Sequence, residues 1–193
     1  MMSDDRQQQI LSAALRVFTR DGFAKATMNA IVKESGLSKG GVYWHFDSKD
    51  AIVIAIFNQF MSGQEALLDT VLAQNIAAPA KLDQLVSLIE ADVANFVDDM
   101  PATLEFYALA TRNPTLKQQL THFYADYLHK IEALFAQGAA EGVWRPLPTA
   151  HTAATFIALF EGVFLLYTLD PHDTPLGQRM KNAINILLTG LNL

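Results

Sequence analysis

Residues 37–46, LSKGGVYWHF, combine two helix-destabilising glycines with a dense group of rings and polar side chains. Gly40 and Gly41 have no side chains, so another molecule can approach the backbone there closely. Lys39, directly before them, carries a positive charge that can reach an anionic or hydrogen-bonding partner. The aromatic and imidazole residues of the stretch are Tyr43, Trp44, His45 and Phe46. This combination suits recognition by close approach and hydrogen bonding.

Residues with the spacing of an enzyme or metal site are not apparent in the chain. It has no cysteine, which excludes disulfides and thiolate chemistry, and no Ser-His-Asp pattern, phosphate-binding loop or suitably paired carboxylates stand out. His122 and His129 lie seven apart on one predicted helix, too far for a shared metal without other ligands. We therefore expect no metal, no cofactor and no catalysis. The other histidines are His45, His151 and His172.

Two short predicted helices, 28–35 and 39–45, are joined by the sequence SGLS at 35–38. Thr27 and Ser38 are suitable N-caps, and Gly36 suits the left-handed position that ends the first helix. This arrangement predicts a helix-turn-helix, whose second helix places its N-terminal end against base edges in the major groove.

The second of these helices should have a buried face and a DNA-facing face. Val42 and Phe46, four residues apart, are predicted to pack inward. Lys39 can reach a base edge or a phosphate, and the free N–H groups at the helix start favour a phosphate nearby. Polar tips on the presumed groove side come from Tyr43, His45 and Lys49.

The whole chain reads as all-α, with about nine helices. Beyond the two short ones, the predicted helices cover 5–21, 49–75, 81–98, a segment after Pro101, 115–137, 149–169 and 176–191. Gly22, Pro79, Asn113-Pro114 and Gly138 are the predicted breaks, and Asp47 or Ser48 is the predicted cap of the helix that starts near Lys49.

Charge is unevenly distributed along the 193 residues, whose total is −6. Residues 1–50 carry seven Lys/Arg and six acids, net +1, and residues 51–193 carry seven and fourteen, net −7. An acidic body argues against wrapping nucleic acid globally and leaves room for local contact by the N-terminal part.

The run TMNAIVKESGLSKGGVYWHFDSKDAI (27–52) resembles the DNA-binding domain of the TetR family of bacterial transcriptional regulators, and ILSAALRVFTRDGFAKAT (10–27) resembles that family's first helix and turn. Val17 stands where the family usually has Leu. The resemblance implies a homodimeric regulator, in that family more commonly a repressor than an activator, that binds a palindromic double-stranded operator and releases it when an effector binds.

That resemblance also assigns roles to individual residues. It implies that Thr27, Ser38, Tyr43 and Lys49 hold phosphates, and that Lys39, Gly40, Gly41, Trp44 and His45 face or approach the bases. An alternative is that Tyr43 and Trp44 are core residues of a small helical domain. We expect a DNA-binding domain at 1–50, continuing into the connecting helix 49–75, and a ligand-binding and dimerisation domain at 51–193.

The last two predicted helices, 149–169 and 176–191, are more apolar than one small domain needs. Pairing with their copies in a second chain would form a four-helix bundle and a two-fold dimer. The alternative is that they only complete the monomer's core. The run 153–169 is shorter than a membrane span and contains Glu161, which we expect to be paired, so no membrane is expected. The residues predicted at the dimer interface are Phe160, Phe164, Leu187, Leu188 and Leu191.

A stripe of rings in the middle of the chain is more often core than pocket, but it can also enclose an apolar cavity. We hypothesise a small hydrophobic or amphipathic effector there. Glu90, Asp92 and Glu105 lie near apolar faces, which mildly favours a cationic ligand, although solvated carboxylates are the more usual case. The residues predicted to bind this effector are Phe96, Met100, Phe106, Phe123, Tyr127 and Phe156.

Two other classes of protein are also compatible with the sequence. A small helical enzyme or binding protein could act on an apolar ligand, and a helical adaptor could use the apolar C-terminal face. The N-terminus has no apolar stretch typical of a signal peptide, and the absence of cysteine fits a reducing compartment, so we expect a cytoplasmic protein.

Overall fold

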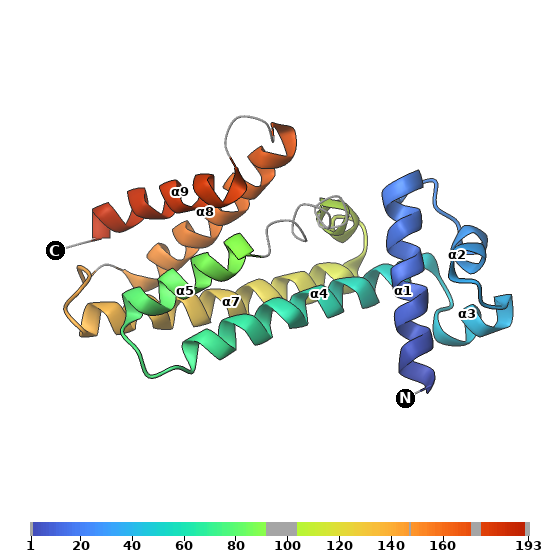
Figure 1. Ribbon diagram of the computed structural model, residues 1–193, viewed down its shortest axis with the longest axis horizontal. Helices are drawn as coiled ribbons and strands as arrows, with labels where there is room; N and C mark the ends of the chain where they lie inside the picture. The colour runs from blue at the N-terminus through green and yellow to red at the C-terminus, as the bar shows by residue number, and fades with distance from the viewer. Residues whose placement is uncertain (1, 92–103, 147, 171–174, 192–193) are drawn as a thin grey trace. The chain divides into compact units, whose positions relative to one another are not determined.

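The computed structural model describes residues 2–91, 104–146, 148–170 and 175–191 (Figure 1). Regular structure in these ranges is helical and includes no strand, which confirms the all-α prediction. The helices are α1 (Met2–Asp21), α2 (Met28–Ser35), α3 (Lys39–His45), α4 (Lys49–Leu72), α5 (Ala78–Ala91), α7 (Pro114–Ala140), α8 (Thr149–Leu169) and α9 (Leu176–Leu191). Residues 104–110 are also helical.

Helix bounds follow the sequence prediction where a local cap or break determines them. The predictions 28–35, 39–45, 149–169 and 176–191 match α2, α3, α8 and α9. The predicted break at Pro79 is wrong, because α5 begins at Ala78 and includes this proline in its first turn, where a missing N–H costs no hydrogen bond. The predicted end of that helix at 98 lies outside the described residues.

Gly138 does not end a helix, contrary to prediction. α7 continues past it to Ala140, and the left-handed residue that follows is Gly142, with φ of 73°. A Cβ atom at Gly138 would overlap the indole ring of Trp144, whose side chain is buried against this turn of the helix. The glycine is therefore required by a close contact rather than by a turn.

The chain divides into two compact units, of which the first comprises residues 1–63 and 99–118. In this unit α1 packs on α2, and α2 contacts α3. Its core includes fully buried side chains of α1, α2 and the N-terminal part of α4, among them Ile10, Ile31 and Ile52. The segment 104–110 joins this core through Phe106, whose ring meets that of Phe57 at 5.3 Å between centroids.

The second unit comprises residues 64–98 and 119–193. Here α9 packs against both α5 and α8, and Figure 1 shows α8 and α9 running side by side. A buried cation, Lys81, connects three helices by donating to the carbonyl of Leu72 at 2.7 Å and to Oε1 of Gln137 at 2.9 Å. These bonds engage two of the three ammonium donors and offset part of the cost of burying the charge.

Two helices, α4 and the Thr149–Tyr167 part of α8, are long and apolar enough to cross a membrane by length and composition alone. The length of α8 therefore does not by itself exclude a membrane span. Core helices of water-soluble proteins meet the same criteria. Glu161, in the middle of α8, accepts a hydrogen bond from the hydroxyl of Tyr124 at 2.6 Å, as the predicted pairing of this carboxylate requires.

The close contact at Gly138 predicts a strong steric effect of one methyl group. Gly138→Ala should lower the free energy of unfolding by about 1–3 kcal/mol, because Trp144 must leave its site. Gly63→Ala is the matched control: it also lies within a helix, nothing surrounds its added Cβ, and it should stabilise by about 0.5–1 kcal/mol. Urea unfolding measures both, and equal effects of the two substitutions would contradict the steric explanation.

Candidate nucleic-acid interface

The first helix of the predicted helix-turn-helix is defined by its caps. The Thr27 hydroxyl accepts a hydrogen bond from the backbone N–H of Ala30 at 3.1 Å, which confirms its predicted role as N-cap. Gly36 adopts a left-handed conformation with φ of 68°, and its N–H donates to the carbonyl of Lys33. Both ends of α2 are thus set by residues that the sequence predicted.

The turn between α2 and α3 is held by side chains as well as by backbone. The buried hydroxyl of Ser35 donates to the carbonyl of Val32 at 2.9 Å and accepts from the N–H of Leu37 at 3.3 Å. From α1, Gln9 donates to the carbonyl of Ser35 at 2.7 Å. These bonds fix the direction in which the chain enters α3.

α3 has seven residues and depends on its cap and its buried face. The Ser38 hydroxyl accepts from the N–H of Gly41 at 3.1 Å, as predicted for an N-cap. Val42 is completely buried and Phe46 nearly so, which confirms the predicted inward face. The opposite side of the helix is left to solvent.

The exposed side of α3 presents aromatic residues. Trp44 is 74% exposed and Tyr43 is 40% exposed, so the alternative that both are core residues is wrong. His45 meets the Trp44 ring edge-on at 4.6 Å between centroids, and the Lys39 ammonium lies 5.6 Å from the Tyr43 ring centre. An exposed indole contributes little to the core, so the Trp44 ring is accessible to a partner molecule.

The two glycines of α3 differ in what surrounds them among the described residues. Neither has a positive φ. A Cβ atom at Gly40 would meet nothing within 4 Å, whereas one at Gly41 would lie 3.2 Å from Oγ of Ser38, the cap of this helix. Neither the backbone conformation nor the packing of the described residues requires glycine at Gly40, and the prediction that it gives clearance to an external partner stays a prediction.

Lys49, predicted to hold a phosphate, is engaged within the protein. Its ammonium donates to the carbonyls of Phe23 at 2.6 Å and Ala26 at 3.0 Å, and lies 4.2 Å from the centre of the Phe23 ring. An ammonium has three donors, so one is left for a phosphate. We call this set of contacts the Lys49 anchor: it ties the start of α4 to the turn between α1 and α2.

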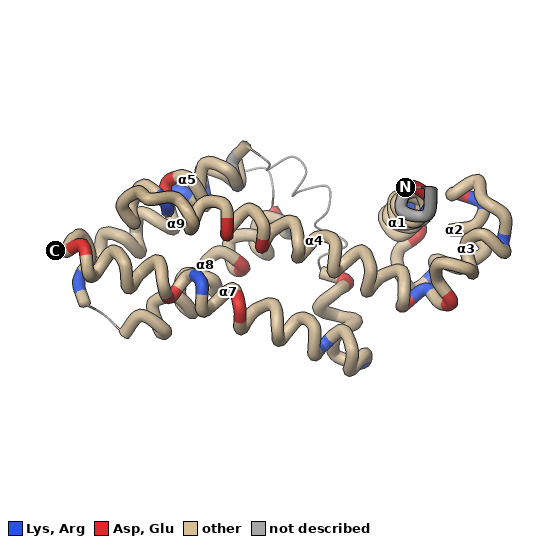
Figure 2. Tube along the Cα trace, turned by 90° about the horizontal axis from the view of Figure 1, so that it is seen from below, with Lys and Arg blue, Asp and Glu red and all other residues tan. Residues whose placement is uncertain are grey.

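Most of the positive charge on α1 is neutralised locally. Arg16 and Arg20 both donate to the carboxylate of Glu34, at 2.9 and 3.0 Å, and Arg20 also pairs with Asp21. The hydrogen bond from Arg16, followed by that from Arg20, lowers the pKa of Glu34 below its ordinary value. Figure 2 shows both signs of charge along this part of the chain. Exposed pairs of this kind stabilise little and chiefly orient α1 on α2.

The residues predicted to bind an effector do not fall in one unit. Phe106 is buried in the first unit, while Phe123, Tyr127 and Phe156 belong to the second. The Phe123 ring lies 5.6 Å from that of Tyr127, and burial together with the charge of Glu161 raises the pKa of Tyr127 to about 12. Phe96, Met100 and Asp92 lie outside the described residues.

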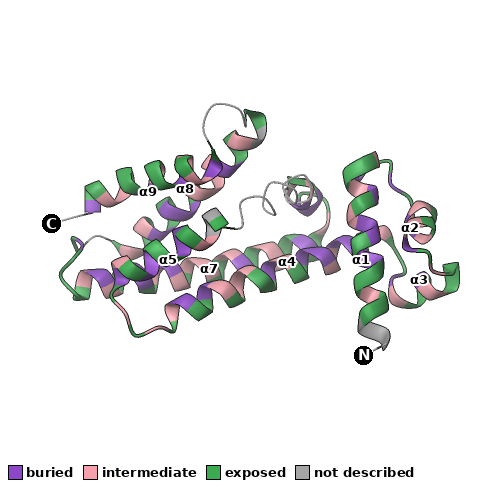
Figure 3. Cartoon of the chain, viewed as in Figure 1, coloured by how far each residue is buried: buried purple, intermediate pink, exposed green. Residues whose placement is uncertain are grey.

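The predicted dimer residues differ in exposure. Phe164 and Leu191 are buried within the single chain, whereas Phe160, Leu187 and Leu188 are half-buried. The most exposed large apolar side chains of these helices are others, and Figure 3 shows exposed residues along both α8 and α9. For α8 the sequence could not separate them from buried ones, because this helix is apolar on nearly all sides. They are Leu165, Leu166, Leu169 and Ile186, exposed by 47%, 60%, 76% and 75%.

Comparison with known families agrees with the helix-turn-helix geometry. Residues 10–56 match the model of bacterial regulatory proteins of the tetR family, and residues 78–191 match the C-terminal model of BetI-type transcriptional repressors. The chain therefore belongs to the TetR family of bacterial regulatory proteins, with a C-terminal region of the BetI type. It is a transcriptional regulator, so the enzyme alternative is wrong.

Individual relatives cover nearly the whole chain. An HTH-type transcriptional regulator of Bacillus subtilis, YfiR, is 30% identical over 162 residues, covering 83% of this chain and 78% of that protein. The nicotine-responsive repressor HdnoR of Paenarthrobacter nicotinovorans is 25% identical, covering 98% and 97%. A transcriptional regulator of Saccharomonospora viridis, solved with choline, has a TM-score of 0.87 at 19% identity, covering 98% and 99%, and so shares the fold.

The Lys49 anchor predicts that this lysine contributes to stability and not only to DNA binding. Lys49→Met should cost about 1–3 kcal/mol, because two carbonyls lose their donor. Lys39→Met, on the exposed side of α3, should change stability by less than about 0.5 kcal/mol. Chemical unfolding compares the two variants, and an unchanged stability of Lys49→Met would contradict the anchor.

Proposed function

We propose that this regulator is a cytoplasmic repressor that binds a palindromic operator as a homodimer and leaves the DNA when a small effector binds. Residues 1–50 would bind the operator, and residues 51–193 would dimerise and hold the effector. The observation that carries the proposal is α3, a capped and anchored helix whose exposed side combines Gly40 and Trp44. Two such helices in a dimer would reach half-sites about 34–36 Å apart, or a multiple of this.

The assignment of contacts on α3 follows from exposure. Lys39, Gly40, Gly41, Trp44 and His45 would approach the bases from the N-terminal end and the exposed side of the helix. The hydroxyl of Tyr43 would reach a phosphate from the same face.

Contacts to phosphates at the edges of this face would come from Thr27, Ser38 and Lys49. The first two caps are exposed, and each hydroxyl uses its oxygen as an acceptor within the helix, so its hydrogen is available to a phosphate oxygen. Lys49 would use its remaining donor. Arg16 and Arg20 are paired with the carboxylate of Glu34. Attraction between positive side chains and DNA phosphates would therefore supply little affinity, and tight binding would need the α3 helices of both protomers.

The proposed effector is a small hydrophobic or amphipathic molecule held by Phe123, Tyr127 and Phe156, together with residues outside the described ranges. Choline, bound by the Saccharomonospora regulator, has a quaternary ammonium, and nicotine, to which HdnoR responds, has a basic amine nitrogen; both favour a cationic effector. Glu161 beside Tyr127 would supply the opposite charge. A thermal-shift screen of cationic and neutral aromatics tests this, and a broad library without a stabilising compound would count against it.

Gly40→Ala separates DNA clearance from folding. The free protein should become more stable by about 0.5–1 kcal/mol, since alanine is the better helix former and its Cβ meets nothing. Affinity for the DNA upstream of its own gene should nevertheless fall by about tenfold or more, because the methyl group separates backbone and DNA. Gel shifts and urea unfolding give the two values, with Gly63→Ala as the control that should stabilise without weakening DNA binding. Unchanged affinity of Gly40→Ala would refute the clearance role.

Ile186→Glu tests the proposed dimer without disturbing the core of the chain. Because this side chain is 75% exposed in the single chain, a charge there should leave the fold intact and repel a second copy across the two-fold interface. Sedimentation should show a monomer. Val143→Glu, also exposed in the second unit but outside α8 and α9, should leave the dimer unchanged. Dimers that persist in Ile186→Glu would exclude this face.

A further inference from the structure

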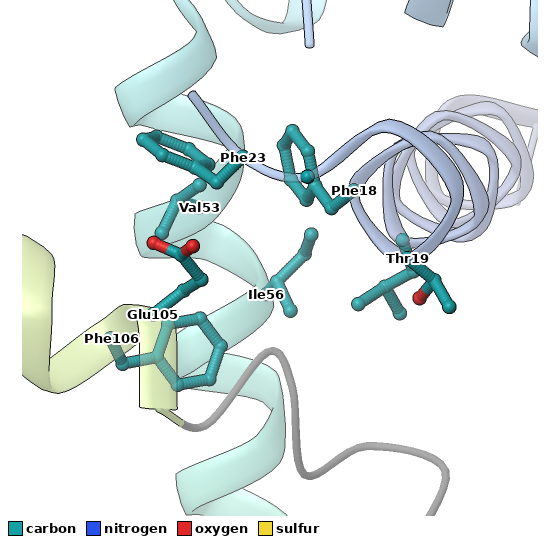
Figure 4. A pocket seen from close by; sticks show the side chains of 9 residues that line it. Phe18, Thr19, Phe23, Val53, Ile56, Glu105 and Phe106 are labelled. Atoms are coloured by element: carbon teal, nitrogen blue, oxygen red, sulfur yellow. The ribbon is translucent and has the colours of Figure 1, made fainter. Parts of the chain in front are cut away.

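A pocket of about 180 Å³ opens within the first unit, and its lining includes Phe106, one of the residues predicted to bind an effector. It is enclosed by the C-terminal part of α1, the turn after it, the first turns of α4 and the helical segment 104–110 (Figure 4). The side chains that determine its chemistry are Phe18, Phe23, Val53, Ile56, Glu105 and Phe106.

The lining of this pocket is aromatic and aliphatic except at one point. Phe18 and Phe23 meet edge-to-face at 5.3 Å between centroids, and Phe106 is held against Phe57 below them. Glu105 alone brings a full charge into the lining, and Figure 4 shows its carboxylate directed towards Val53 and Phe23. One face of Phe23 already meets the Lys49 ammonium at 4.2 Å from the ring centre, so the faces of Phe18 and Phe106 beside the carboxylate of Glu105 form the environment that attracts a further cation.

The size of the pocket limits the occupant. An apolar cavity of about 150 Å³ is known to take up one benzene ring, so this pocket can hold a single ring with a short polar arm.

We propose that this pocket is a second ligand site, which takes a small monocyclic organic amine in its protonated form. The ring would lie among Phe18, Phe23 and Phe106, and the ammonium would donate hydrogen bonds to the carboxylate of Glu105. Binding at this pocket would not require the operator or the effector proposed for the second unit.

An occupant of this pocket would also touch the turn that the Lys49 anchor holds. Phe23 lines the pocket with its ring and accepts the Lys49 hydrogen bond with its carbonyl. Val53 lies one helical turn after Lys49 on α4. Binding should therefore slow amide hydrogen exchange in the turn at 22–26 and in the first turns of α4, near the helix-turn-helix.

The test uses benzylammonium as the probe and benzyl alcohol as its neutral match of similar size, added to the full-length protein. NMR titration should give saturable shifts for Val53 and Ile56, with the amine binding more tightly than the alcohol. Glu105→Gln should weaken the amine by about tenfold and leave the alcohol unchanged, since one charge-assisted contact is lost. Glu65→Gln, a half-buried carboxylate of α4 outside the pocket, is the matched control and should change neither.

A second variant fills the space instead of removing the charge. Thr19 lines the pocket from the exposed side of α1, so Thr19→Phe can place a ring over the opening and should abolish binding of both probes. Exchange protection at 22–26 in the wild-type protein gives a readout that needs no variant. The proposal is overturned if neither probe gives saturable shifts, if Glu105→Gln leaves the preference for the amine unchanged, or if the shifts lie in the second unit. Because DNA is absent from every measurement, failure here leaves operator binding as a separate question.

Discussion

Burial of Val42 and Phe46 is the interaction on which the exposed surface of α3 depends. A seven-residue helix is not stable by itself in water, because too few hydrogen bonds offset the cost of nucleation. α3 therefore exists only because two side chains fasten it to the first unit and the Ser38 hydroxyl caps it. The turn before it is fixed in the same way, through Ser35 and Gln9. These contacts fix the orientation of α3 and leave its other side exposed to solvent.

Because α3 is held by its cap and its buried side chains, it can contain residues that are unfavourable in a helix. Glycine at Gly40 lowers helical stability and adds no internal contact, and the exposed ring of Trp44 contributes little to the core. Both are costs to the free protein that binding to DNA can offset. The Lys49 anchor adds a related constraint, because one lysine both joins α4 to the turn at Phe23 and retains a donor for a phosphate. In the proposed function, folding and DNA binding would therefore share Lys49.

The sequence predicted the features that local chemistry determines. Thr27, Gly36 and Ser38 act within a few residues of themselves, so α2 and α3 have the expected bounds. Features that depend on distant partners were missed or misread. A helix end was predicted near Gly138 because glycine often ends helices. The sequence does not show that the indole of Trp144, from the following loop, lies against this glycine. The partners of Lys49, two backbone carbonyls more than twenty positions earlier, leave no pattern in the sequence. On α8, a helix that is apolar all round, periodicity could not separate buried Phe164 from exposed Leu166.

The central claim is that the exposed side of α3 faces DNA, and the two tryptophans allow a direct test. Trp44 is 74% exposed and Trp144 is 4% exposed, so acrylamide should quench the first and hardly affect the second. In a Trp144→Phe variant confirmed to be folded, all fluorescence comes from Trp44. The account predicts that a DNA fragment from upstream of the gene, at a ratio that gives a complete gel shift, protects Trp44 from acrylamide. Full gel shift with unchanged quenching of Trp44, or no shift with that DNA, would contradict it.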